Sequence, residues 1–279
     1  MTGKIWNRYI ELQVGSLFVT NQNLKIDFSI KAGDSSDANT FEISIWNLKR
    51  ANREAIKADQ DIFLTAGYED DYGSIFTGTV KTVGDERDGS DIKTRIIALT
   101  QEYAKKVTVP TYRKGTAIGT IVREMFSLSK LTIGKIDDQG VVLDSDATPS
   151  GTTVYEVLDW CKNTINGSQD VLNEIKKEVR FYIEGGEAFF VPTDYVRPVI
   201  EKIVLSSDTG LIETTLETPD DESYTRSIKC FLQWRVRTNS LIELKSKMTG
   251  ASGTYNVVEY EHSCDGTDFV TEMKVKPAS

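Results

Sequence analysis

The chain has 279 residues, of which 39% are hydrophobic and 27% charged, with a formal net charge of −9 at pH 7. This length suffices for two or three modules with apolar cores of their own, and the composition excludes a disordered or collagen-like chain. No apolar run approaches the ~20 residues of a membrane helix, and residues 1–9 lack the apolar core of a secretory signal. We therefore expect synthesis in a cytosol without membrane insertion. The acidic balance argues against specific nucleic-acid binding, which depends on clustered Lys and Arg.

The first hundred residues alternate apolar and polar side chains with the period of two that is typical of half-buried strands. This pattern predicts strands at residues 9–14, 24–30, 41–45, 61–66, 74–83 and 92–99. The polar segment 32–39 predicts the loop of a hairpin, and a short helix is expected at about 49–58 with Asn47 as its N-cap. Short strands at this density indicate a small antiparallel barrel or sandwich.

The middle of the chain changes from strand to helix periodicity. Residues 118–128 and 154–165 carry apolar side chains at helical spacing. Thr153 and Glu156 match a capping box, and Gly167 suits a left-handed position after the second helix. Gly185 and Gly186 separate two apolar runs, which predicts a tight hairpin. The segment therefore reads as a mixed α/β insertion.

Alternation returns at residues 228–236, and further strands are predicted at 241–244, 255–260 and 269–275. We therefore predict a mainly β protein with an α/β insertion, in which two small antiparallel β-barrel modules flank a mixed α/β domain. The expected boundaries are 1–105 for the first β-barrel module, 106–199 for the α/β insertion domain and 200–279 for the second β-barrel module.

The single histidine, His262, lies two residues before Cys264 on a predicted strand. Side chains two apart on a strand stand ~6 to 7 Å from each other, too far for the hydrogen bond between a thiol nucleophile and its base. We expect a histidine near a strand end with its polar neighbours in solvent. The three cysteines form no CxxC motif and are expected to be reduced and mostly buried.

Acidic clusters at residues 69–71, 137–138 and 144–146 have the residue types of a two-carboxylate glycoside hydrolase. Each lies in a predicted turn, where acids are commonly solvated, and none matches a calcium loop. The segment 113–119 carries two cations at a helix start, where an anion can bind, but no phosphate-binding glycine motif is present. We expect an ordinary helix start.

Trp46, Phe63 and Phe76 have the side chains of a carbohydrate platform, yet their positions on predicted strands favour the core. No residue is therefore assigned as catalytic, cofactor-binding or metal-binding, and no cofactor is expected.

One stretch, residues 41–80, is more specific than these motifs. It joins a strand ending in Trp46–Asn47–Leu48, a short helix, a strand entering Ala66–Gly67–Tyr68 and a strand over residues 75–80. This arrangement resembles the first β-barrel of phage baseplate hub proteins, the family that includes late-control D proteins and the hub of phage-like contractile particles. Helix openings at 115–116 and 152–153 look like the middle domain of that family, and segments 205–211 and 253–258 look like its second barrel.

The resemblance implies a structural baseplate hub subunit of a contractile phage or phage-like tail. In such hubs three chains with two barrels each make a pseudo-sixfold ring that adapts a hexameric tail tube to a trimeric central spike. The implied partners are two further copies in a homotrimer, the tail tube protein, the central spike protein and other baseplate proteins. The implied location is a particle tail assembled in the cytoplasm of a bacterial host, and no enzymatic activity is expected.

Two alternatives from other classes remain open at this point: a cell-wall hydrolase using paired carboxylates and a carbohydrate-binding tail module. Within the family, a hub-like protein of a non-contractile tail also remains open.

Overall fold

The computed structural model describes residues 7–33, 40–100, 106–129, 131–198, 202–216, 226–247 and 251–278. The chain divides into two compact units. The first contains Met1–Gly33, Asn39–Thr100 and Val196–Ser279, and the second contains Asp34–Ala38 and Gln101–Tyr195. Within the described ranges, no helix is long and apolar enough to cross a membrane.

The first unit is almost entirely β. Its strands before the insertion are β1 (Arg8–Val14), β2 (Leu17–Thr20), β3 (Ile26–Gly33), β4 (Thr40–Trp46), β5 (Asp61–Tyr68), β6 (Asp71–Asp88) and β7 (Asp91–Leu99). Its strands after the insertion are β11 (Ile203–Ser206), β12 (Leu211–Leu216), β13 (Arg226–Phe231), β14 (Leu241–Lys245), β15 (Gly253–Cys264) and β16 (Phe269–Pro277). Among its described residues, the unit also contains the helix α1 (Arg50–Ala55) and the 3₁₀ turn Ser207–Thr209.

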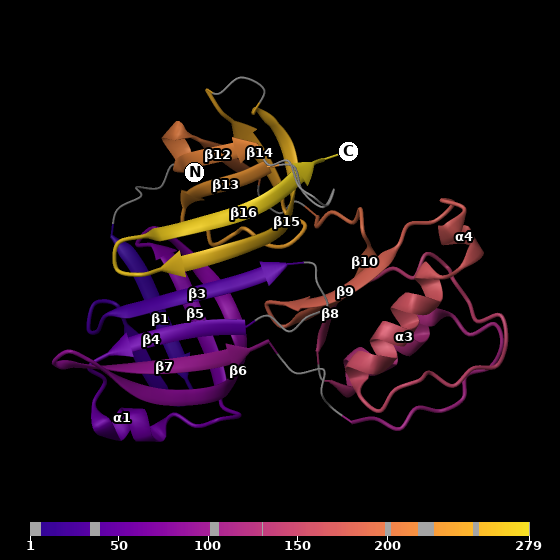
Figure 1. The fold of residues 1–279 in the computed structure, drawn as a ribbon, viewed down its shortest axis with the longest axis horizontal. Helices are drawn as coiled ribbons and strands as arrows, with labels where there is room; N and C mark the ends of the chain where they lie inside the picture. The colour runs from indigo at the N-terminus through magenta and orange to yellow at the C-terminus, as the bar shows by residue number, and fades with distance from the viewer. Residues whose placement is uncertain are drawn as a thin grey trace. The chain divides into compact units, whose positions relative to one another are not determined.

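These strands form one 13-stranded sheet with the order β12-β13-β16-β15-β3-β4-β7-β6-β5-β1-β2. Figure 1 shows the middle of this order, from β16 through β15, β3 and β4 to β7. β14 pairs with β15 beside β3, and β11 pairs in parallel with β14, whereas the other pairs are antiparallel. Among the described strand pairs, none closes either half into the predicted barrel. The reason is topological, because β3 takes β15 as its outer neighbour instead of returning to β2.

The apolar cores of the two halves are shared. Alternate residues of β1, such as Ile10 and Leu12, point into the first core, as the period-two pattern requires. Leu232, Cys264 and Phe269 come from the second half and pack in the same cluster. Ala32 of β3 in turn joins the second core. The halves therefore bury apolar surface jointly.

The second unit contains helices α2 (Ile118–Leu128), α3 (Val154–Asn166) and α4 (Gln169–Leu172). They accompany a three-stranded mixed sheet with the order β8 (Thr132–Ile136), β10 (Glu187–Pro192) and β9 (Val179–Glu184). The predicted glycine hairpin is confirmed, since Gly185 and Gly186 have φ of 61° and 80° and join β9 to β10. The pattern did not predict β8, whose side chains are mostly exposed.

The predicted capping box of α3 is also confirmed. Thr153 Oγ1 accepts a hydrogen bond from Glu156 N at 3.3 Å, and Glu156 Oε2 accepts one from Thr153 N at 3.0 Å. Hydrogen bonds to the carboxylate from Thr152, and then from Thr153, lower the pKa of Glu156. Gly167 follows the helix as expected, but its φ of −85° is right-handed, so the predicted left-handed cap is wrong.

The predicted start of the first helix is wrong as well. The N-cap of α1 is Lys49, and Asn47 adopts a left-handed φ of 56°. Its side chain instead donates to Asp91 Oδ1 at 3.0 Å and accepts from Ile92 N at 3.1 Å, so it joins β4 to the start of β7.

We predict that Thr153→Ala lowers the free energy of unfolding by about 1 kcal/mol, because two backbone N–H groups at the start of α3 lose their partners or the geometry that orients them. Urea unfolding of the whole chain measures the change. Thr120→Ala, at an exposed position of α2, serves as the control and should stay within about 0.5 kcal/mol of the parent. Equal losses for both variants would contradict the capping assignment.

Candidate assembly interface

The two halves of the large sheet meet at one strand pair, which we call the seam. In the seam the C-terminal part of β15 lies antiparallel to β3, from Glu259 opposite Gly33 to Cys264 opposite Phe28. His262 and Ile30 face each other here with fully buried side chains. Backbone hydrogen bonds and apolar burial therefore act together along the seam.

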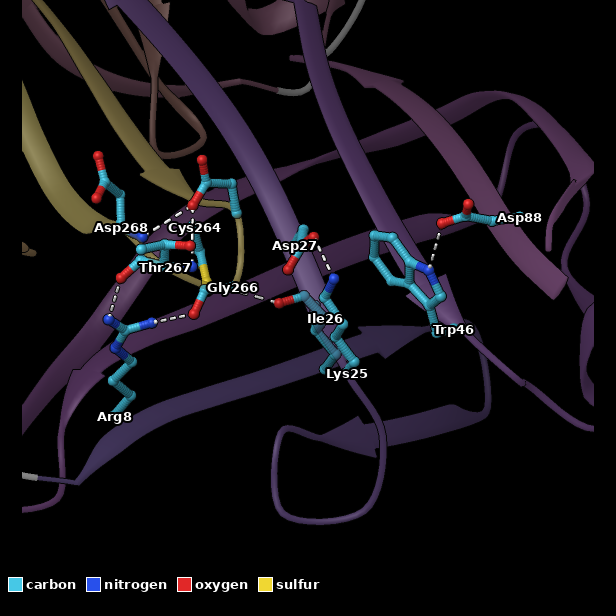
Figure 2. A network of polar contacts seen from close by, with 11 residues as sticks. Arg8, Lys25, Ile26, Asp27, Trp46, Asp88, Cys264, Gly266, Thr267 and Asp268 are labelled. Carbon is cyan, nitrogen blue, oxygen red and sulfur yellow. Dashed lines mark hydrogen bonds and ion pairs between the residues drawn. The ribbon is translucent and has the colours of Figure 1, made fainter. Parts of the chain in front are cut away.

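The turn at the end of the seam, residues 265–268, is held from two sides. Within the turn, Asp265 Oδ1 accepts hydrogen bonds from Thr267 N at 3.1 Å and Asp268 N at 2.8 Å, and these bonds lower the pKa of Asp265. From β1, Arg8 donates to Gly266 O at 3.1 Å and to Thr267 O at 2.5 Å (Figure 2). The guanidinium thus fixes a turn of the second half onto a strand of the first.

A second tie joins the β5–β6 turn to the loop after β13. Asp71 accepts a hydrogen bond from Trp234 Nε1 at 2.7 Å, and both of its carboxylate oxygens lie within 2.7 Å of Arg235 Nη1. A Cβ at Gly73 would lie 2.3 Å from the Trp234 ring, so only glycine lets the indole approach β6 this closely. This contact explains why the strand predicted over residues 228–236 ends at Phe231, since Trp234 leaves the sheet to reach Asp71.

The two halves of the sheet repeat one arrangement of strands. The order β3-β4-β7-β6-β5 in the first half corresponds to β12-β13-β16-β15-β14 in the second, and all neighbours in both series are antiparallel. The long strands β6 and β15 each contain a register shift, between Val80 and Thr82 and between Val257 and Glu259. Just before each shift, the pairing with β5 or β14 ends.

The repeat leaves a trace in the sequence that the sequence analysis missed. The β6–β7 turn is Asp-Gly-Ser-Asp at residues 88–91, and the β15–β16 turn is Asp-Gly-Thr-Asp at residues 265–268. Gly89 and Gly266 both have positive φ, 64° and 87°. Counting back from the turns places Arg87 at the position of Cys264 and Thr82 at that of Glu259, which agrees with the register shifts.

This equivalence shows one formed seam and two further edges that no described strand pairs. Beyond its register shift β15 pairs with β3, whereas the corresponding part of β6, residues 82–88, pairs on one side only with β7 among the described strands. β12, the counterpart of β3, pairs only with β13 within the same ranges. Leu216 of β12 is 66% exposed, although its counterpart in β3, Ile30, is fully buried.

His262 lies near the strand end as predicted, but its ring is fully buried. Nδ1 lies 2.8 Å from Thr271 Oγ1, and burial, followed by the charge of Arg237, holds the pKa of His262 well below its usual value. Cys264 Sγ contacts the Ile26 carbonyl at 3.7 Å, so the two residues have separate partners.

The expectation of free, buried cysteines is confirmed for Cys161, Cys230 and Cys264. Burial raises the pKa of Cys161 and of Cys230 to about 12, so both thiols stay protonated at neutral pH.

Several acids predicted to be solvated instead fix the backbone. Asp71 belongs to the tie described above. Asp138 accepts hydrogen bonds from Gly119 N at 2.7 Å and Gly140 N at 3.0 Å, and Asp146 accepts one from Lys114 N at 2.7 Å. The Asp138 carboxylate thus occupies the start of α2, where the anion site was considered. No group of three potential metal ligands occurs in the part of the chain that the structure describes.

The expectation of three core aromatics is confirmed only for Phe76. Trp46 is half-buried, and Lys25 Nζ lies 4.0 Å from its ring centroid. Figure 2 shows the Lys25 and Trp46 side chains as neighbours. Phe63 is 42% exposed, because its neighbours Ile62 and Leu64 take the inward positions of β5. It lies opposite Gln13, which in turn lies opposite exposed Phe18, so an aromatic surface crosses β5, β1 and β2.

Comparison with solved structures shows which proteins have this architecture. The tail protein from Neisseria meningitidis MC58 has a TM-score of 0.67 and 9% identity, with 97% of each chain covered. The 43 kDa tail protein of prophage MuSo2 from Shewanella oneidensis has a TM-score of 0.68 and 11% identity, with 98% of this chain and 99% of that one covered. No family model and no curated protein matches the sequence.

An E. coli component of the type VI secretion system, itself described as structurally similar to the T4 bacteriophage tail proteins gp27 and gp5, also matches. Its TM-score is 0.56 at 10% identity, with 96% of this chain and 77% of that one covered. The chain therefore has the fold of phage tail proteins over nearly its whole length. The resemblance found in the sequence is confirmed at the level of the fold.

We predict that Asp71→Ala lowers the free energy of unfolding by about 2 to 3 kcal/mol, because it leaves a partly buried guanidinium and an indole N–H without their shared acceptor. Asp70→Ala, which removes the exposed neighbouring carboxylate, is the matched control and should cost no more than about 0.5 kcal/mol. Chemical denaturation of both variants measures the difference. A small loss at Asp71, equal to that at Asp70, would mean that the tie is not needed for stability.

Proposed function

We propose that this protein is a structural baseplate hub subunit of a contractile phage or phage-like tail. The observation that carries the proposal is the repeat: one chain holds two copies of one β arrangement, joined edge to edge by the seam. In this proposal residues 1–105 and 200–279 are the two β modules of the hub, and residues 106–199 are the domain inserted between them.

A repeated module suits an adapter between two symmetries. Three chains with two modules each place six similar β modules around one axis, while the chains themselves keep threefold symmetry. Such a ring presents six similar surfaces to a hexameric tail tube and three identical surfaces to a trimeric central spike. The partners of this subunit are therefore two further copies, the tube protein, the spike protein and other baseplate proteins.

Known assemblies with the same fold support a role in binding other proteins. A PdpA–VgrG complex contains a chain that matches with a TM-score of 0.58 at 9% identity, covering 100% of this chain and 66% of that one. The aromatic surface of Phe18 and Phe63 gives this chain an exposed apolar area outside the seam. Aromatic side chains of this kind are enriched at protein interfaces.

The polar groups described above support a structural role rather than catalysis. Asp71, Asp138 and Asp146 hold parts of the chain together, and the thiols of the buried cysteines are protonated. The net charge of −9 disfavours retention of nucleic acid. The subunit acts by transmitting a rigid geometry between its partners.

We predict a solution mass of three times the 31.2 kDa chain mass in multi-angle light scattering at high protein concentration. A stable assembly of two or four copies would contradict the proposal. The hydrolase alternative predicts loss of turbidity of bacterial cell walls, and the carbohydrate-binding alternative predicts retention on a glycan array. A monomer that clears cell walls or binds glycans would replace the hub proposal with the corresponding alternative.

A further inference from the structure

We propose that residues 85–88 of β6 in one copy pair antiparallel with β12 of the next copy, and so repeat the seam between chains. This inference rests on the proposed function and names the strands of its subunit interface. The occupant of each open edge is thus a second copy of this chain.

The first argument is that the same pairing already exists inside the chain. β15 binds β3 beyond its register shift, and β6 and β12 are their counterparts in the repeat. An unpaired strand edge presents a row of N–H and C=O groups that readily accepts another strand. A contact that joins two different edges of identical chains is heterologous, and it closes into a ring when its rotation divides a full turn. Six equal rotations from one module to the next, alternately within a chain and between chains, complete a full turn after three chains.

The second argument concerns side chains. Ile212 and Leu216 of β12 are 47% and 66% exposed, and Phe231 of the adjoining strand is 45% exposed. The counterpart of Leu216 is Ile30, which lies opposite His262 in the seam and is fully buried in the first core. Pairing between chains would cover apolar surface at β12 in the same way, and this burial favours association.

The charge pattern selects the partner edge. The β6 segment carries three acids, Asp85, Glu86 and Asp88, against one cation, Arg87, so pairing two β6 edges would bring together two segments of net negative charge. β12 carries a single acid, Glu213, followed by the neutral Thr214 and Thr215. The two edges therefore fit each other better than β6 fits itself.

The repeat also fixes the register. In the seam Ser263 lies opposite Ser29. Counting from the Asp-Gly turns makes Glu86 the counterpart of Ser263. The pairing leads from β7 through β4 to β3 in the first half, and from β16 through β13 to β12 in the second. These registers make Thr215 the counterpart of Ser29. Glu86 of one copy thus lies opposite Thr215 of the next.

Disulfide trapping in the full chain tests this register. Residues directly opposite on antiparallel strands have Cα atoms ~4.5 to 5.5 Å apart, within the range that a disulfide spans. We expect Glu86→Cys combined with Thr215→Cys to convert most of the protein to a covalent trimer on a non-reducing gel under mild oxidation. The native cysteines are all buried, which limits their interference.

The matched control combines Glu86→Cys with Thr214→Cys. A shift by one residue moves the second sulfur to the opposite face of the sheet, so the covalent trimer should be lost. Equal cross-linking of both double variants would overturn the register. Covalent dimers from Glu86→Cys alone would overturn the inference by showing that β6 pairs with itself.

Light scattering of the same samples separates this inference from the proposed function. A trimeric mass without a disulfide between positions 86 and 215 would overturn the strand pairing and leave the trimer standing. A ladder of covalent species beyond the trimer would support the pairing but contradict the closed ring. A monomer without cross-links at high protein concentration would contradict both the strand pairing and the trimeric hub.

Discussion

The antiparallel pairing of β15 with β3 is the interaction on which the large sheet depends. It joins the two halves through backbone hydrogen bonds, and the apolar cores cross it: Cys264 and Phe269 pack into the first core, and Ala32 into the second. Arg8 and Asp71 reinforce the same junction through hydrogen bonds to the second half. Because these contacts are shared, the halves are expected to unfold together rather than as independent domains.

The seam also determines which strand edges remain without a partner among the described strands. β15 is long enough to pair with β14 before its register shift and with β3 after it, and β6 has the same division. Two modules joined edge to edge form one such strand pair within the chain, between β15 and β3. Among the described strands, the corresponding edges of β6 and β12 then have no partner. This is the physical reason why we interpret the chain as a part of a larger assembly, and the fold that it shares with phage tail proteins agrees with that interpretation.

Local features were predictable from the sequence because their causes are local. The strand periodicity, the Thr153–Glu156 capping box and the Gly185–Gly186 hairpin each depend on residues close together in the chain. The seam, the Asp71–Trp234 contact and the burial of His262 depend on partners far away in sequence, which periodicity does not identify. The exposure of Phe63 was not predicted for a different reason. Residues 62–64 are all apolar, so the sequence pattern does not show which of them points outward. The two Asp-Gly turns can be seen in the sequence, but only the strand registers show that they occupy equivalent positions in a repeat.

The central claim is that two equivalent modules per chain form one ring of six. Electron microscopy of the isolated assembly tests it most directly, through the rotational symmetry of end-on class averages. The account predicts a ring with strong sixfold and threefold components around a central opening. Averages with twofold or fourfold symmetry, or open filaments, would contradict it.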